Sequence, residues 1–302
     1  MSDERDRILK LLEDGKITAD QATRLIEALG SQSAGPEFSR GPHGPFGVER
    51  HFRVRGGHRD FGRIPDIVAT AVASAMKSGF EPGEERSTDF PGKRHLLVKS
   101  VSGDLDVARG DEDKVAVSYT GGMVKVRTSG DQVVVRTMAG DVSATVPADG
   151  RLELEVVSGD VSVNDGSARI EVRTVSGDVD IDQSTGGIQV KTVSGDVDLD
   201  GVSGSVEVET RSGDIELGAT GPISGSLESV SGDVTVDLPE DADLVLELAT
   251  EEDGDIHVDD DLPHEVLEEH DEYMKLKLGA GSRTLKVTTK IGDIEIGRAE
   301  EK

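Results

Sequence analysis

Cysteine and tryptophan are absent from this chain of 302 residues, which also holds only two tyrosines and six phenylalanines. Without cysteine, neither a disulfide nor a thiolate metal site can form, and the composition does not identify a redox compartment. Between Arg151 and Val236 there is no aromatic residue, whereas sugar-binding sites usually offer aromatic platforms. The composition therefore speaks against a carbohydrate site in this stretch and requires an aliphatic interior.

Basic residues are also scarce, because 33 Lys and Arg stand against 61 Asp and Glu, for a formal charge of -28. This balance argues against a nucleic-acid partner, since phosphate binding depends on Lys and Arg. The N-terminus has neither the basic start nor the apolar run of a secretory signal. No segment approaches the ~20 apolar residues that cross a bilayer. We expect a cytoplasmic protein, with peripheral contact to a membrane left open.

Two apolar stripes predict a helical hairpin over residues 1–30. Thr18 and Gln21 fit a capping box, and Gly15 and Gly30 stand where the helices should end. Helices this short are marginal alone, so we expect their stripes to dock on a protein partner or on another copy of the chain. The docking residues predicted here are Ile8, Leu11, Leu12, Leu25, Ile26 and Leu29.

Residues 31–63 are rich in Gly, Pro and Arg and predict a flexible, locally basic linker. Residues 64–80 follow as an amphipathic helix, with Pro65 in its first turn and Gly79 at its end. Residues 40–80 are the candidates for a peripheral membrane contact, against the alternatives of a tether to the acidic surface and of docking on the core.

A repeat fills residues 93–299. Ser-Gly-Asp recurs there, and Asp160, Asp178, Asp196 and Asp214 follow one another at intervals of eighteen residues. After nearly every Gly-Asp, apolar and polar residues alternate, as in Val179 and Ile181, which is typical of half-buried strands. The residues predicted to form the turns are Gly159, Asp160, Gly177, Asp178, Gly195, Asp196, Gly213, Asp214, Gly232 and Asp233.

Each repeat unit is therefore expected to hold two strands and two turns. One unit buries too few aliphatic side chains to offset the entropy of ordering eighteen residues, but stacked units close one another's apolar faces. We predict a mainly β fold, a single-stranded parallel β-solenoid of about 18-residue coils. An antiparallel meander or sandwich stays open as an alternative, because it would also place like turns at like edges.

The aspartates of the turn are expected to stack in register and to accept a backbone N–H within their own turn. The alternative is weak Ca²⁺ binding by these stacked aspartates. No other cofactor is expected. "DVDLDGVSGSVE" from Asp196 resembles the start of an EF-hand loop, but its apolar residues belong to the strand pattern. The candidate metal ligands are Asp178, Asp180, Asp182, Asp196, Asp198 and Asp200.

Other chemical templates find no match, and no catalytic residue is predicted. The histidines of "HEVLEEH", His264 and His270, are six residues apart and would not share a helix face as zinc ligands do. Residues 237–271 contain sixteen acids and no Lys or Arg, which predicts an exposed connection before a final hairpin.

Two segments resemble known families. "ILKLLEDGKITADQATRLIEAL" is similar to the SHOCT-like helical module of envelope-stress proteins of the LiaX/YvlB type. The repeated Ser-Gly-Asp units, "LPEDADLVLELATEEDGDI" and the closing "GAGSRTLKVTTKIGDIEIG" resemble the putative-adhesin family of β-strand-repeat proteins, a domain of unknown function. The resemblance implies a right-handed parallel β-helix-like fold. It also implies a setting in the bacterial envelope-stress response, where relatives are tied to sensing or resisting cationic antimicrobial peptides.

We therefore expect a non-enzymatic scaffold or interaction protein that presents an acidic β-solenoid surface to a protein partner or to cationic peptides. The first alternative is a calcium-binding structural solenoid. The second is a carbohydrate-active β-helix enzyme, which would need a groove with a carboxylate pair and aromatic walls.

Overall fold

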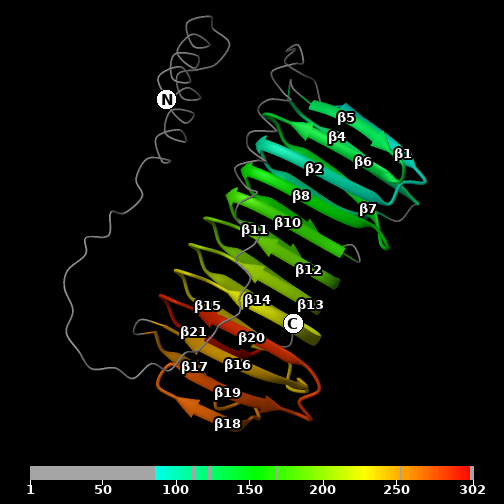
Figure 1. Cartoon of the computed structure of the whole chain (residues 1–302). Coiled ribbons are helices and arrows are strands. Elements are labelled where there is room, and N and C mark those ends of the chain that lie inside the picture. The colour runs from blue at the N-terminus through cyan, green and yellow to red at the C-terminus, as the bar shows by residue number, and fades with distance from the viewer. Residues whose placement is uncertain (1–85, 111–112, 122–123, 167–168, 252–253, 300–302) are drawn as a thin grey trace, which may run out of the picture. The chain divides into compact units, whose positions relative to one another are not determined.

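A computed structural model describes residues 86–110, 113–121, 124–166, 169–251 and 254–299. The predicted helical hairpin, basic linker and amphipathic helix over residues 1–80 lie outside the described residues. Inside them, all regular structure is β (Figure 1). Among these residues, no helix has the length and apolar character needed to cross a membrane.

The strands stack into two facing walls. We call wall A the set of strands that face the viewer in Figure 1, all joined edge to edge. In stacking order, wall A consists of β5 (Val124–Ser129), β6 (Gln132–Thr137), β2 (His95–Ser102), β8 (Arg151–Ser158), β10 (Arg169–Ser176), β12 (Thr185–Lys191), residues 203–209 of β13 (Val197–Glu209), residues 223–228 of β14 (Ile215–Glu228), β20 (Thr284–Thr289), β16 (Leu244–Thr250), β19 (Tyr273–Leu278) and β18 (Glu265–His270).

Wall B is the second stack, and long strands β13 and β14 pass from it into wall A. In stacking order, wall B consists of β1 (Arg86–Pro91), β4 (Lys114–Tyr119), β7 (Val142–Pro147), β3 (Leu105–Gly110), β9 (Val161–Asn164), β11 (Val179–Asp182), residues 197–200 of β13, residues 215–218 of β14, β15 (Val234–Leu238), β21 (Ile294–Arg298) and β17 (Ile256–Val258).

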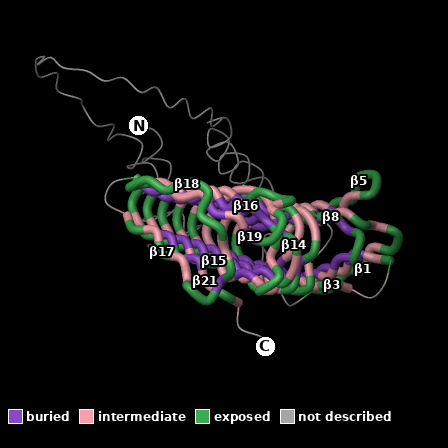
Figure 2. The backbone as a smooth tube through the Cα atoms, turned by 90° about the horizontal axis from the view of Figure 1, so that it is seen from below, coloured by how far each residue is buried: buried purple, intermediate pink, exposed green. Residues whose placement is uncertain are grey.

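The middle of the stack is parallel and in strict register. Ile170 of wall A pairs with Ile188, which pairs with Val206, and Val179 of wall B pairs with Val197. Because side chains alternate along a strand, each of these residues points inward, and all are buried. Figure 2 shows the buried backbone lining the inside of both walls. The predicted mainly β fold of stacked strands with an aliphatic interior is confirmed, while the handedness of the coil stays a prediction.

Stacking order departs from chain order near both ends. The coil formed by β2 and β3 lies between β6–β7 and β8–β9. The last coil, β20–β21, lies between β14–β15 and β16–β17. The prediction of an exposed connection over residues 237–271 is therefore wrong, because β16 contributes the buried Leu244, Leu246 and Leu248 to the core. The final strands are likewise a parallel coil rather than a hairpin.

Antiparallel strands close the two ends of the stack. At one end β4 runs antiparallel to β7 and β1 to β4, and β5 runs antiparallel to β6. At the other end β19 runs antiparallel to β16, and β18 to β19. The expectation of a purely parallel solenoid is thus corrected at both ends, where hairpin connections bring the chain back beside itself.

Candidate functional site

A column of glycines forms one edge of the stack, where each coil turns from wall A into wall B. Gly195 has a φ of 130°, a region that favours glycine. A Cβ on Gly195 would lie 2.2 Å from the carbonyl oxygen of Gly177, one coil away. Gly177 and Gly213 repeat this geometry. Glycine is therefore required here both by the backbone angle and by the close approach of the next coil.

A column of aspartates follows the glycines and is joined by hydrogen bonds. In each step, the backbone N–H of one Asp donates to the Oδ1 of the Asp in the neighbouring coil. The donors and acceptors are Asp104 to Asp141 (3.2 Å), Asp160 to Asp104 (3.1 Å), Asp178 to Asp160 (3.0 Å), Asp196 to Asp178 (2.9 Å), Asp214 to Asp196, Asp233 to Asp214, Asp293 to Asp233 and Asp255 to Asp293 (2.8 Å each).

We call this column the aspartate ladder. It corrects the expectation that each carboxylate accepts an N–H from its own turn, because the donor comes from the next coil. The ladder follows the stacking order, so Asp160 binds Asp104, 56 residues earlier in the chain. A charge-assisted hydrogen bond at every step offsets the repulsion between stacked carboxylates. The predicted turn residues from Gly159 to Asp233 all lie in these two columns.

A column of buried hydroxyls lies beside the ladder, and the sequence analysis missed it. The Thr192 and Thr210 side chains donate to the carbonyls of Ser194 and Ser212, at 3.3 and 3.4 Å. Both threonines are almost fully buried. The signal in the sequence is a Thr two residues before the triplets that begin at Ser176, Ser194 and Ser212. Its role is to satisfy a carbonyl at the corner.

Outside the turn, wall B carries carboxylates in register along its outer face. Asp180 of β11 pairs with Asp198 of β13, and Asp198 with Glu216 of β14, while Asp182 pairs with Asp200. Partial burial, then the charges of Asp182 and Asp200, raise the pKa of Asp180. The pKa of Asp198 is raised in the same way, first by burial and then chiefly by Asp180 and Glu216.

No Lys or Arg occurs in the five consecutive wall B segments that surround these acids. Their residues are Val161–Asn164, Val179–Asp182, 197–200, 215–218 and Val234–Leu238. These five central strands of wall B therefore place acids on their outer face without Lys or Arg of their own, whereas basic residues occur in β1, β3, β4 and β21. We call Asp180, Asp182, Asp198, Asp200 and Glu216 the acidic patch.

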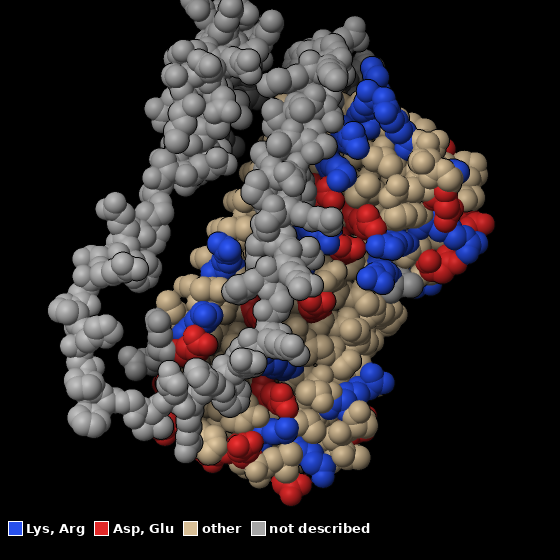
Figure 3. Space-filling model, in the orientation of Figure 1, with Lys and Arg blue, Asp and Glu red and all other residues tan. Residues whose placement is uncertain are grey.

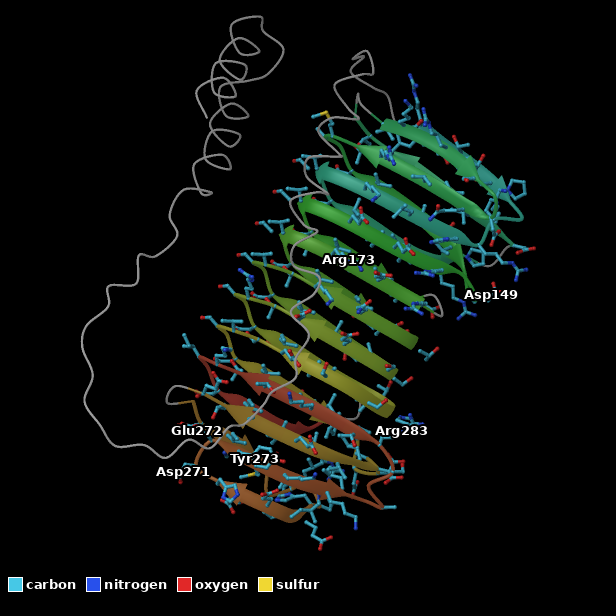
Figure 4. The ribbon with its side chains drawn as sticks, viewed as in Figure 1. Asp149, Arg173, Asp271, Glu272, Tyr273 and Arg283 are labelled. Atoms are coloured by element: carbon cyan, nitrogen blue, oxygen red, sulfur yellow. The ribbon has the colours of Figure 1, made fainter. Side chains whose placement is uncertain are left out.

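Wall A, by contrast, is covered with ion pairs between and along its strands. Lys191 of β12 binds Glu209 of β13 at 2.7 Å, and Lys275 of β19 binds Glu247 of β16 at 2.8 Å. Figure 3 shows Lys and Arg interspersed with Asp and Glu over this face. Other pairs are Lys99 with Glu155, Arg173 with Glu171 and Arg151 with Glu153. Arg173 lies near the middle of this face in Figure 4.

The candidate metal ligands fall into separate rows. Asp178 and Asp196 belong to the ladder, whereas Asp180 and Asp198, and Asp182 and Asp200, form rows on wall B. Within the described ranges, no group of three or more His, Asp or Glu is placed to hold a metal ion. His264 and His270 lie in and beside strand β18 rather than on a helix. The EF-hand-like segment from Asp196 likewise lies in a turn and in strand β13.

A shallow groove of about 450 Å³ lies where β4 and β7 meet β3 and β9 on wall B. It holds Tyr119 and four aspartates, of which Asp104, Asp141 and Asp160 belong to the ladder. The ladder therefore uses three of the four carboxylates for structure, and one aromatic side chain lines the groove. This arrangement does not supply the carboxylate pair between aromatic walls that a glycoside hydrolase would need.

The predicted docking residues Ile8, Leu11, Leu12, Leu25, Ile26 and Leu29 lie outside the described residues. Over that segment, however, the model of a SHOCT-like domain matches residues 3–33. No curated protein matches the chain.

Three solved structures match at low identity. A putative adhesin from Bacteroides fragilis is 16% identical, with 72% of this chain and 100% of that chain covered and a TM-score of 0.37. A putative cell adhesion protein from Clostridium sporogenes is 12% identical, with 71% and 99% covered and a TM-score of 0.31. The model of the Toastrack DUF4097 family matches residues 85–200 and 169–297, and the chain belongs to this family.

Proposed function

We propose that this protein is a non-enzymatic interaction scaffold whose wall B binds a cationic partner. The observation that carries the proposal is the acidic patch, where Asp180, Asp198 and Glu216 stand in register on strands without Lys or Arg. A surface on which like charges repel one another attracts ligands of the opposite charge. Cationic amphipathic peptides, which the resemblance to envelope-stress proteins suggests, have this chemistry.

The proposal is tested by titrating the full chain with a labelled cationic amphipathic peptide and measuring fluorescence anisotropy. We expect Asp180→Asn with Asp198→Asn to weaken binding about tenfold, because each close charge pair at an interface contributes up to a few kcal/mol. Raising the ionic strength from about 0.05 to 0.5 M should weaken binding to the unmodified chain.

A matched control removes the same charge from the other wall. Glu207→Gln with Glu228→Gln neutralises two exposed acids of wall A and should leave the peptide affinity within about twofold of the unmodified chain. Equal losses from the two double variants would show that net charge, rather than wall B, attracts the peptide. Binding that salt does not weaken would contradict the proposal outright.

The same resemblance suggests that the SHOCT-like domain and the strand stack have different roles. We propose that residues 1–30 join a protein partner or a second copy while the stack presents its walls. A pull-down from native lysate with the full chain, beside a variant with Leu11→Asp and Leu25→Asp, tests this arrangement. Retention of the same proteins by both chains would rule out docking through the predicted apolar stripes.

A further inference from the structure

Wall A ends on two strands that have a neighbour on one side. β5 pairs with β6, and β18 pairs with β19, and the described residues provide no second partner for either strand. Figure 1 shows β5 and β18 at opposite ends of the stack. An edge strand of this kind exposes a row of backbone N–H and C=O groups that can pair with a further strand.

The two edge strands carry opposite charges. β5 has the sequence VKVRTS, with Lys125 and Arg127 and no acid, whereas β18 has the sequence EVLEEH, with no Lys or Arg. Because Val126 pairs with the buried Val135, the alternation places Lys125 and Arg127 on the outer face, where both are exposed. Figure 3 shows Lys and Arg gathered at the end of the stack where β5 lies.

The existing neighbour of β18 shows which sequence this strand accepts. In β19, Lys277 lies opposite Glu265, Leu276 opposite Val266 and Lys275 opposite Glu268, with a register shift in β18 at Leu267. Lys277 and Glu265 come within 3.6 Å. The triplet Lys-Leu-Lys of β19 thus faces Glu265, Val266 and Glu268 of β18, with Leu267 passed over at the register shift.

β5 repeats the β19 pattern as Lys125, Val126 and Arg127. The direction of β5 is also suitable. β5 runs antiparallel to the parallel strands of wall A. β18 runs in the same direction as those strands, because β19 is antiparallel to β16 and β18 is antiparallel to β19. A copy of the chain translated along the stack would therefore bring its β5 antiparallel to β18 of the first copy. Val266, which is 48% exposed, would gain an apolar neighbour.

We propose that copies of this chain stack head to tail, with β5 of one copy pairing antiparallel with β18 of the next. With the register shift at Leu267 kept as in the pair with β19, Arg127 then lies opposite Glu265, Val126 opposite Val266 and Lys125 opposite Glu268. The contact joins two different surfaces, so it does not close on itself and produces rows of copies. This self-association is independent of the peptide binding proposed for wall B, because it uses the ends of wall A.

The experiment is sedimentation velocity of the full chain over a range of concentrations at low salt. We expect the weight-average mass to rise with concentration and to fall again on addition of salt. Lys125→Glu with Arg127→Glu, or Glu265→Lys with Glu268→Lys, should each weaken self-association at least about tenfold, because like charges then face each other. The control Arg283→Glu with Lys286→Glu makes the same charge change just before and within β20, inside the stack, and should leave the mass unchanged.

Mixing the two charge-reversed variants separates a lost contact from a lost fold. Each contact in the mixture joins an acidic strand of one variant to a basic strand of the other, so the mass of the unmodified protein should return. A monomeric wild-type chain at its highest soluble concentration would overturn the proposal, and so would a mixture that stays monomeric. Slow hydrogen exchange at every dilution of the β5 amides that point away from β6 would also overturn it, since another part of the same chain would then cover this edge.

Discussion

Walls A and B are built from the same repeat, share one aliphatic interior and differ on their outer faces. On wall A, basic side chains lie beside acids of neighbouring strands, as Lys191 lies beside Glu209. On wall B, the acidic patch repeats one charge from strand to strand. Two like charges on adjacent strands repel by about 1 kcal/mol in water. The difference shows that the interior sets the fold, while the outer positions are free to serve solubility or recognition.

The largest expected effect concerns the corner that joins the two walls. Gly195→Ala should lower the free energy of unfolding by about 3 to 5 kcal/mol, because the new Cβ meets the Gly177 carbonyl at a φ that disfavours alanine. Urea unfolding followed by circular dichroism measures this change. Gly187→Ala is the control, since a Cβ there meets nothing within 4 Å. A large loss from Gly187→Ala would mean that the repeat tolerates no added atom anywhere.

The inner faces of the two walls should respond equally. Ile170 of wall A and Ile181 of wall B are both fully buried. Ile170→Ala and Ile181→Ala should each cost about 2 to 5 kcal/mol through lost burial and the cavity left behind. Thermal and urea unfolding of the two variants provide the comparison. A much smaller loss on one side would show that the walls differ inside as well as outside.

The aspartate ladder should contribute less than the core. Asp196→Ala removes the acceptor for the Asp214 N–H, and we expect a loss of about 1 to 3 kcal/mol. Asp196→Asn keeps an oxygen in place and should cost less. Urea unfolding ranks the two variants against the unmodified chain. The ladder would have no structural role if alanine and asparagine were equally harmless.

The smallest effect has the opposite sign. Asp180→Asn with Asp198→Asn should stabilise the fold at pH 7 by a few tenths of a kcal/mol to about 1 kcal/mol, because it relieves repulsion that solvent partly screens. Glu209→Gln on wall A is the control and should destabilise slightly, since it breaks the pair with Lys191. Thermal unfolding at low and high salt measures both. A stabilised Glu209→Gln would contradict the contrast between the walls.

The pH dependence of this double variant follows from the same pKa shifts. In the folded state the pKa values of Asp180 and Asp198 lie above the ordinary value of 3.8. The two carboxylates therefore destabilise the fold at a pH above their raised pKa values, and this cost is relieved as the pH falls through those values toward 3.8. Asn at both positions should remove this pH-dependent change, which urea unfolding at pH 7 and at a pH below 3.8 would reveal.

Local patterns were sufficient for the strands and the corners. The alternation of Val179 and Ile181 and the repeated Gly-Asp predicted half-buried strands and a tight turn. They could not predict which coil lies beside which. In the displaced coil β2–β3, Leu105 and Val107 follow the same apolar and polar alternation as the residues of the other coils. The hydrogen-bond donor to each Asp was missed for the same reason. The repeated sequence is the same whether the N–H comes from the turn of that Asp or from the turn of the neighbouring coil.

The contrast between the walls was equally inaccessible to the sequence. Lys99 and Glu155 are 56 residues apart in the chain and meet only because β2 is inserted beside β8. Charge compensation therefore depends on stacking order, which the composition does not encode. The net charge of -28 predicted an acidic protein without showing that ion pairs join the strands of wall A while acids repeat in register on the central strands of wall B.

The displaced coil β20–β21 affects how the protein can be assembled during synthesis. Its strands leave the ribosome after β16–β17, yet they lie between those strands and β14–β15. The growing chain therefore cannot complete its stack in the order of synthesis. The strands β16 and β17 can pair with their parallel neighbours only after β20 and β21 have been synthesised. A premature stop after residue 280 would remove an internal layer rather than shorten the stack by one coil, and it would leave β16 without its parallel partner.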